Sequence, residues 1–380
     1  MNPHLPQGGG AAVEFSTQSP CAVQAVTQLR HALDRPGLQM VLFFASLSSY
    51  EPEPLQQALN DAFDVPVIGC TSAGQVGHAG FQAGGLTAVG FFGSGWFFKP
   101  HLITSLSVEG QPIEASIAAM ERDVDAIPEG MKPFGLVLVD GLSMQEERLM
   151  AHLYRSLIQM PIVGGSAGDD LNFEQTLVFC DGAFHRDAAL FVLCATDKVF
   201  ATVRAQHHQP TSTKLVVTEA DPSVRIIHEI NGLPAADAYS QAIGVPVAEF
   251  CPEVYSLYPV MIRVGDAHYI RSIQRCNPDK SLTFYCAIER GLVLSVGHRA
   301  DALEALSLAF ERVQEQIQGR PELIIGFDCI LRRLEFEARG LNGAIVEQFV
   351  NHNVVGFYTY GEQINGLHVN QTFTGIAFGA

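Results

Sequence analysis

Residues 66–76 read PVIGCTSAGQV, and residues 161–171 read PIVGGSAGDDL. Each segment places a proline before a short run of apolar and glycine residues, and each run ends in small or hydroxyl-bearing residues. Such a turn after a strand can hold an anion with its backbone N–H groups. It can equally be a tight strand exit that needs glycine for a positive φ and that a duplicated fold uses twice. The two segments therefore indicate a duplication, a site, or both.

The residues around these segments repeat in the order strand, helix, strand and turn. Leu55, Leu59 and Phe63 share one helix face before the first segment, and a similar apolar run precedes the second. A weaker third copy closes the chain with NVVGFYTYGEQ at 353–363. The pattern predicts a mixed α/β (α+β) fold of duplicated strand–helix–strand units with antiparallel additions.

Composition excludes several classes of partner. The chain has 380 residues, with 40 acidic against 23 basic side chains and a net charge of −17. Nucleic acid and anionic membranes require a basic face, so neither is expected as a partner. The sequence shows no signal-peptide pattern and no apolar run long enough for a bilayer, and a cytoplasmic location is expected. None of the eight cysteines forms a CxxC motif, which favours buried thiols over disulfides or zinc.

Three further segments carry a family resemblance. IHEINGLPAADAY, FDCILRR and GFYTYGEQINGLHVNQT, together with the two turns, resemble the FIST family, whose members join a FIST N and a FIST C region. The resemblance implies an N-terminal tail and helix at residues 1–35, a FIST N-terminal domain at 36–228 and a FIST C-terminal domain at 229–380. It also implies a sensor of a small ligand in signal transduction.

One branch of the family resembles this chain in length, the NosP haemoproteins. The resemblance implies a haem b sensor of nitric oxide that regulates a partner histidine kinase and cyclic-di-GMP or biofilm output. Because the sequence contains no kinase, receiver or GGDEF-like segment, the signal would pass to a separate protein, and a homodimer is compatible with this function. The alternative is a haem-free FIST sensor of an amino acid or a similar small metabolite.

A haem sensor needs an imidazole that leaves the opposite axial position of the iron open to a gas. His185 lies just before a strongly apolar strand and is the first candidate for the iron ligand. His207 and His208 follow the strand VFATVRA and are the second candidates, and Arg204 would pair with a haem propionate. For each histidine, a structural or surface role is the alternative.

A ligand pocket is expected where the small-residue turns meet. Its predicted lining is Cys70, Thr71, Ser72, Gly164, Gly165 and Ser166. In the C-terminal segment, Glu362 would bind a cationic amine and Asn370 would order the pocket, although Asn365-Gly366 also predicts a plain hairpin.

Cys329 stands close to Arg332 in the sequence and would be a reactive thiolate or a haem thiolate ligand. The alternative is a buried cysteine at a strand end, with arginines that pair with acids. The sequence contains no HExxH or GxSxG motif and no phosphate-binding GxxxxGK[ST] loop, so an enzyme is not expected. The acidic pairs Asp169-Asp170 and Glu146-Glu147 are expected to be solvated.

Overall fold

The computed structural model describes residues 11–108, 113–158 and 160–379. Most of the predicted N-terminal tail, residues 1–10, lies outside these residues, and the helix predicted after it is α1 (Ala22–Ala32). No helix in the described part of the chain is long and apolar enough to cross a bilayer.

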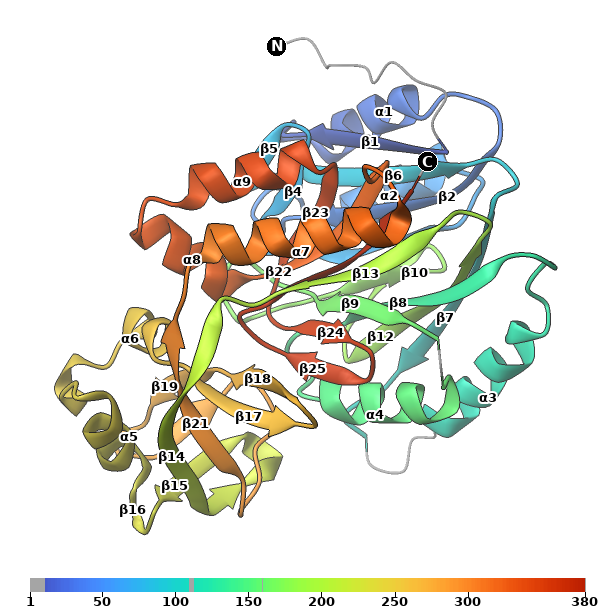
Figure 1. The fold of residues 1–380 in the computed structure, drawn as a ribbon. Helices are drawn as coiled ribbons and strands as arrows, with labels where there is room; N and C mark the ends of the chain where they lie inside the picture. Colours follow the sequence, from blue (N-terminus) through green and yellow to red (C-terminus); the bar gives the residue numbers. More distant parts are fainter. Residues whose placement is uncertain (1–10, 109–112, 159, 380) are drawn as a thin grey trace.

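Three repeat units form the larger part of the molecule (Figure 1). Each unit has two parallel strands joined through one or two helices, with an antiparallel strand beside the first of them. The first unit consists of β2 (Leu38–Ala45), α2 (Pro52–Ala62), β3 (Val67–Thr71) and β6 (Leu86–Phe92). The second unit consists of β8 (Lys132–Val139), α4 (Glu146–Ser156), β9 (Ile162–Ser166) and β12 (Ala188–Thr196). The third unit consists of β22 (Leu323–Cys329), α8 (Ile330–Ala338), α9 (Asn342–Asn351), β23 (Val354–Thr359) and β26 (Phe373–Phe378). The predicted mixed α/β fold with repeated units is confirmed.

The units are interlocked because each donates a hairpin to the sheet of another. The first unit adds its hairpin to the third sheet, the third adds its own to the second, and the second adds its own to the first. The hairpins are β4 (Gln75–Gly77) with β5 (Gly80–Gln82), β10 (Val178–Cys180) with β11 (Ala183–His185), and β24 (Glu362–Ile364) with β25 (Leu367–Val369). All three sheets therefore share one strand order, and the outer strands that complete them are β1 (Ala12–Thr17), β7 (Trp96–Thr104) and β13 (Phe200–Ala205).

One apolar core lies between the three sheets. Leu42, Leu136 and Ile325 come from the first strand of each unit, and all belong to this core. The outer face of each sheet is covered by helices: α1 and α2 on the first, α3 (Ile113–Val124) and α4 on the second, and α7 (Ala302–Ile317), α8 and α9 on the third. Because the central strands are buried on both faces, they are nearly continuous apolar runs.

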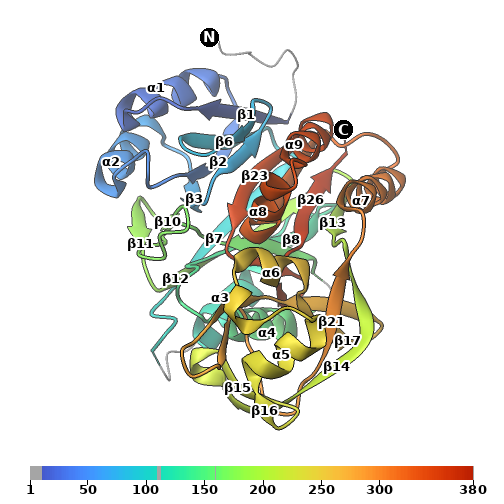
Figure 2. The same cartoon turned by 90° about the vertical axis from the view of Figure 1, so that its left-hand side faces the viewer.

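Residues 208–299 form an inserted module with its own core between the second and third units (Figure 2). Its strands are β14 (His208–Asp221), β15 (Ile226–Ile230), β16 (Leu233–Pro234), β17 (Val260–Val264), β18 (Ala267–Arg271), β19 (Ile273–Cys276), β20 (Leu282–Phe284) and β21 (Val293–Arg299), and its helices include α5 (Ala235–Ile243) and α6 (Pro252–Leu257). The predicted boundary after residue 228 lies within β15, and the division into two contiguous domains stays a prediction.

One glycine in each unit allows its two parallel strands to pair closely. A Cβ on Gly69 would lie 2.3 Å from the Phe43 carbonyl oxygen, and one on Gly164 would lie 1.9 Å from that of Val137. In the third unit, a Cβ on Gly356 would lie 1.7 Å from the carbonyl oxygen of Gly326. None of the three glycines has a positive φ. These glycines are needed for close backbone approach, and the positive φ offered as the structural explanation occurs instead at Gly74 in the first segment.

The substitution Gly164→Ala is expected to lower the free energy of unfolding by about 3 kcal/mol, since two buried strands must separate to admit the new methyl group. Gly343→Ala in α9 is the matched control, because no atom lies within 4 Å of the position that its methyl group would take and alanine favours a helix by about 1 kcal/mol. Urea unfolding measures both. Equal stability of Gly164→Ala and the wild type would contradict the steric explanation.

Candidate ligand-binding site

The turns that end β3, β9 and β23 meet at the carboxyl edge of the three sheets. The Gly168 N–H donates to the Thr71 carbonyl at 3.1 Å, and the Ala73 N–H donates to the Tyr358 carbonyl at 3.1 Å. All the predicted turn residues are buried, namely Cys70, Thr71, Ser72, Gly164, Gly165 and Ser166. The structure therefore brings both sequence segments, and their third copy, to one place, which is the edge where α/β proteins usually bind ligands.

The polar groups of these turns are largely occupied by the protein itself. Thr71 accepts a hydrogen bond from the Leu177 N–H at 3.0 Å, and Ser72 shares one of 2.6 Å with Gln75. The Ser166 N–H donates to the Gly361 carbonyl at 2.8 Å. The turns therefore hold the units to one another, and these groups are not free to bind an anion.

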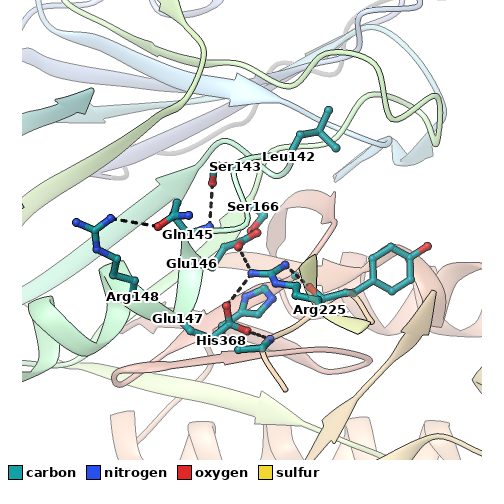
Figure 3. A network of polar contacts seen from close by, with 12 residues as sticks. Leu142, Ser143, Gln145, Glu146, Glu147, Arg148, Ser166, Arg225 and His368 are labelled. Atoms are coloured by element: carbon teal, nitrogen blue, oxygen red, sulfur yellow. Dashed lines mark hydrogen bonds and ion pairs between the residues drawn. The ribbon is translucent and has the colours of Figure 1, made fainter. Parts of the chain in front are cut away.

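A buried cluster of charges lies beside the turns, where the inserted module contacts α4 (Figure 3). The Arg225 Nη2 lies 2.7 Å from a carboxylate oxygen of Glu146 and 2.7 Å from one of Glu147. Its Nη1 donates to the Tyr285 carbonyl at 2.6 Å. The prediction that Glu146 and Glu147 are solvated is wrong for Glu146, which is 2% exposed. The first turn of α4 faces the module, and a helix N-terminus favours carboxylates.

The ionisation of this cluster follows from its pairing. Burial alone would raise the pKa of Glu147, but the positive groups around it, Arg225 and Arg271 among them, and a hydrogen bond from the Ala287 N–H outweigh burial and hold that pKa below the usual value. Burial likewise opposes the charge on Arg225, and the two glutamates nevertheless raise its pKa. Glu147 and Arg225 therefore stay charged inside the protein, and any change in their partners has a large energetic effect.

A cavity of about 140 Å³ adjoins the cluster. Glu146 and Arg225 form part of its wall, together with the aromatic rings of Phe173, Tyr285 and Tyr360. The Phe173 and Tyr360 rings stack with centroids 4.9 Å apart. Pockets for drug-sized molecules start at about 300 Å³, so this cavity suits a smaller ligand, of the size of a free amino acid.

The hydroxyl of Tyr360 is fixed by the second acidic pair. It donates to a carboxylate oxygen of Asp169 and accepts from the Leu171 N–H at 2.8 Å. Asp169 is 2% exposed and also accepts from the backbone N–H groups of Phe173, Glu174 and Gln175. Asp169, like Glu146, is a buried structural acid that sequence reasoning placed in solvent.

The predicted residues Glu362, Cys329 and Arg332 lie close together in the third unit. A carboxylate oxygen of Glu362 accepts from the Thr372 N–H at 3.1 Å. Burial raises the pKa of Glu362 and that of the Cys329 thiol well above their usual values. Both side chains are therefore neutral, and Cys329 has the character of a buried thiol rather than of a reactive thiolate.

Arg332 is fully buried and pairs with Asp328 at 2.7 Å. Burial raises the pKa of Asp328 to about 6 despite this pairing. Asn370 accepts from the Ser272 N–H at 3.2 Å and so joins this region to the inserted module.

Several buried polar atoms in this C-terminal region have no hydrogen-bond partner among the described residues. They are Arg271 Nε, Asp328 Oδ2, Arg332 Nη2, Glu362 Oε1, Gln363 Oε1, His368 Nε2, Asn370 Nδ2 and Gln371 Oε1. Buried polar groups are nearly always paired, and each unpaired one costs about 1–3 kcal/mol. Their concentration in one region makes it a candidate for a polar ligand or for ordered water.

Of the candidate haem residues, only His207 and His208 are in ring contact, with ring centroids 4.3 Å apart, and each candidate already has contacts within the protein. His185 is half-buried in β11, and its ring Nε2 lies 3.1 Å from the Cys180 carbonyl. His207 is buried, with Arg332 at 3.2 Å from one ring nitrogen and Glu335 at 2.9 Å from the other. Arg204 lies over the ring of Tyr269 at 4.3 Å and donates to the backbone.

His208 leaves one nitrogen without a partner among the described residues. Its Nε2 donates to the Ser256 carbonyl at 3.0 Å, and its Nδ1 is buried and unpaired. His207, His208 and Glu335 have ligand atoms within 4.8 Å of one another, as a metal site requires. Arg332 donates to His207 Nδ1, however, which places the ring proton on Nε2, the nitrogen that a metal would need.

Haem also requires a large cavity beside its axial ligand. Three hollows of about 590–700 Å³ are lined by other residues, and the largest includes His268, Lys214 and Arg263. The candidate set of His185, His207, His208 and Arg204 therefore does not fit a haem.

Sequence reasoning missed Arg271, Gln363 and His368, and it did not pair Arg225 with the glutamates of α4. Gln363 and His368 lie inside the segment GFYTYGEQINGLHVNQT, between the predicted site residues Glu362 and Asn370. Arg225 and Arg271 belong to the inserted module, and no motif marks them. Only the packing of this module against α4 and β25 shows their role.

Comparison with known proteins gives a family match over most of the chain. Residues 39–233 match the FIST N domain, and residues 235–365 match the FIST C domain. An uncharacterised protein of Methanocaldococcus jannaschii is 24% identical over 277 residues, which is 64% of this chain and 53% of that protein. The chain therefore spans about half the length of this relative. FIST domains are associated with the sensing of small ligands in signal transduction.

His208 generates a prediction about acid stability. Burial lowers its pKa from 6.5 to about 3, so between these pH values the unfolded chain binds a proton that the folded protein does not. The free energy of unfolding therefore falls as the pH falls through this window, by about 2 kcal/mol between pH 6.5 and pH 5.

Urea unfolding at several pH values measures this slope. His208→Gln is expected to flatten it, and a comparison at pH 8 corrects for the packing that the substitution changes. An unchanged slope in His208→Gln would assign the acid sensitivity to other groups.

Proposed function

We propose, from the premise that this chain belongs to the FIST family, that it is a haem-free sensor of a small zwitterionic metabolite such as an amino acid. In this proposal it is a binding protein and not an enzyme. The observation that carries the proposal is the buried Arg225, which two glutamates share at the wall of a small cavity.

An amino acid has the charges that this cluster can exchange. Its carboxylate can replace one glutamate on Arg225 in a bidentate pair, and its ammonium group can pair with the glutamate that is released. Every buried charge keeps a partner throughout, which avoids the cost of about 3–5 kcal/mol for an uncompensated one. Phe173, Tyr285 and Tyr360 supply the apolar part of the wall.

The position of the cluster supports a route from binding to output. Besides Arg225, the inserted module contacts α4 and the hairpin β24–β25 through polar groups. The Ala287 N–H donates to Glu147, and Arg271 donates to the His368 carbonyl at 2.8 Å. Polar interfaces of this kind permit relative motion of two bodies. A ligand that draws Arg225 away from α4 would shift the module and change the surface offered to a partner such as a histidine kinase.

The haem-based nitric oxide function is the competing proposal. It needs a ring nitrogen that is open toward a cavity of haem size, and the contacts of His185 and His207 work against this. An absorption spectrum with added hemin distinguishes the two proposals directly, because a bound haem gives a Soret band that shifts with nitric oxide.

Thermal unfolding with a panel of L-amino acids tests the proposed function. A ligand at 100 times its dissociation constant stabilises the native state by about 2.7 kcal/mol, which raises the melting temperature by several degrees. Arg225→Gln is expected to abolish this rise, and Arg263→Gln, on an exposed strand of the same module, is the matched control.

Glu147→Gln serves if Arg225→Gln does not fold. Glu147→Gln is expected to lower the affinity for the stabilising amino acid at least 10-fold, because a neutral amide holds the ammonium group less strongly than a carboxylate does. Uptake of hemin together with no response to any amino acid would overturn the proposal and favour haem.

A further inference from the structure

The three repeat units provide an internal comparison for the ligand site. In each hairpin, one residue is aligned across the strands with the close-approach glycine of the adjoining unit. These residues, each with its cross-strand partner in the hairpin, are Val76 with Phe81, Phe179 with Phe184, and Gln363 with His368. The three pairs therefore occupy equivalent places in the fold.

Two of the three pairs are apolar: Val76 and Phe179 are buried core residues, and their partners are half-buried and pack against the core. The Phe81 ring lies edge-on to Tyr358 at 5.5 Å, and the Phe184 ring lies edge-on to Phe179 at 4.9 Å. The third pair, Gln363 and His368, is buried but polar. Since the fold is satisfied by apolar residues at the two equivalent places, it does not require the polar pair.

Gln363 and His368 fix each other in one orientation. The Gln363 Nε2 lies within hydrogen-bond distance of three acceptors, which are Ser166 Oγ at 3.0 Å, the Gly361 carbonyl at 3.2 Å and His368 Nδ1 at 3.2 Å. Because the His368 Nδ1 accepts, a neutral ring carries its proton on Nε2. Burial lowers the pKa of His368, which keeps the ring neutral.

The pair leaves one acceptor and one donor without partners among the described residues, Gln363 Oε1 and His368 Nε2–H. The pair is linked to the cavity wall, because Ser166 Oγ lies 3.4 Å from a carboxylate oxygen of Glu146. His368 lies beside Glu147 and below Arg225 in Figure 3. Gln363 and His368 do not line the cavity, and Glu146 lies between it and Ser166, so a ligand at Arg225 meets the two free atoms by displacing Glu146 from the guanidinium.

We propose that Gln363 and His368 recognise a carboxamide group, so that the ligand class is amino acids with a side-chain amide, L-glutamine and L-asparagine. The carboxamide oxygen accepts from His368 Nε2–H, and its NH₂ group donates to Gln363 Oε1. This inference rests on the proposed function at Arg225. A carboxylate analogue has no proton for Gln363, and an aliphatic analogue leaves both buried atoms unpaired. Sites built around such hydrogen bonds reject analogues that lack them by about 100-fold or more.

Isothermal titration of the full chain with L-glutamine, L-asparagine, L-glutamate and L-leucine tests the inference. Binding of one amide at least 100-fold tighter than L-glutamate and L-leucine is the expected result. Comparable affinities for amides and non-amides would overturn the inference and leave the proposed function standing. No binding of any amino acid would overturn both.

The double variant Gln363→Val with His368→Phe installs the apolar pair of the first unit and should fold for that reason. It is expected to lose the preference for amides, with its affinity for L-glutamine reduced at least 100-fold. His352→Phe, whose ring stacks on Phe310 outside the site, is the control and should bind as the wild type does. An unchanged preference in the double variant would overturn the inference, and the ligand series on the wild type decides it if the variant does not fold.

Discussion

The close approach of a glycine to the carbonyl oxygen of the neighbouring parallel strand sets the geometry on which the rest of the molecule depends. It occurs once in each unit, at Gly69, Gly164 and Gly356, and at each place a methyl group would overlap the backbone. The hairpin of another unit pairs alongside the same glycine. Three sheets can therefore join by exchange of hairpins and enclose one core.

This arrangement also decides where ligand chemistry is available. The turns that follow the glycines use their own polar groups to hold the units together, as the hydrogen bond between Gly168 and Thr71 shows. Charged side chains contact one another beside these turns, where Arg225 of the inserted module pairs with the glutamates of α4. A buried arginine with two glutamates is rarely the most stable filling of a protein interior, because desolvation of the charges offsets much of their attraction. Such a cluster beside a cavity therefore points to binding.

The repeated architecture separates what folding needs from what function needs. At equivalent places, Phe81 and Phe184 are half-buried and pack against aromatic rings, whereas His368 keeps a nitrogen without a partner in the described part of the chain. The contacts of the candidate haem residue His207, by contrast, are explained by folding alone. His207 is held from both sides by Arg332 and Glu335, so a role in the packing of α8 against β13 accounts for its contacts. The polar segment from Glu362 to Gln371 is therefore better suited to bind a ligand than the histidines that precede the module.

The sequence by itself determined the repeat, because the periodic apolar residues, the segment glycines and the Asn365-Gly366 hairpin turn are local signals that survive in one dimension. It also determined the family, and it selected the C-terminal segment that contains Glu362 and Asn370. Only the tertiary structure decided which units exchange hairpins, since this choice depends on contacts between strands far apart in the chain. It alone placed Arg225 against Glu146, because burial and the pairing of charges are properties of packed neighbours that no single segment encodes.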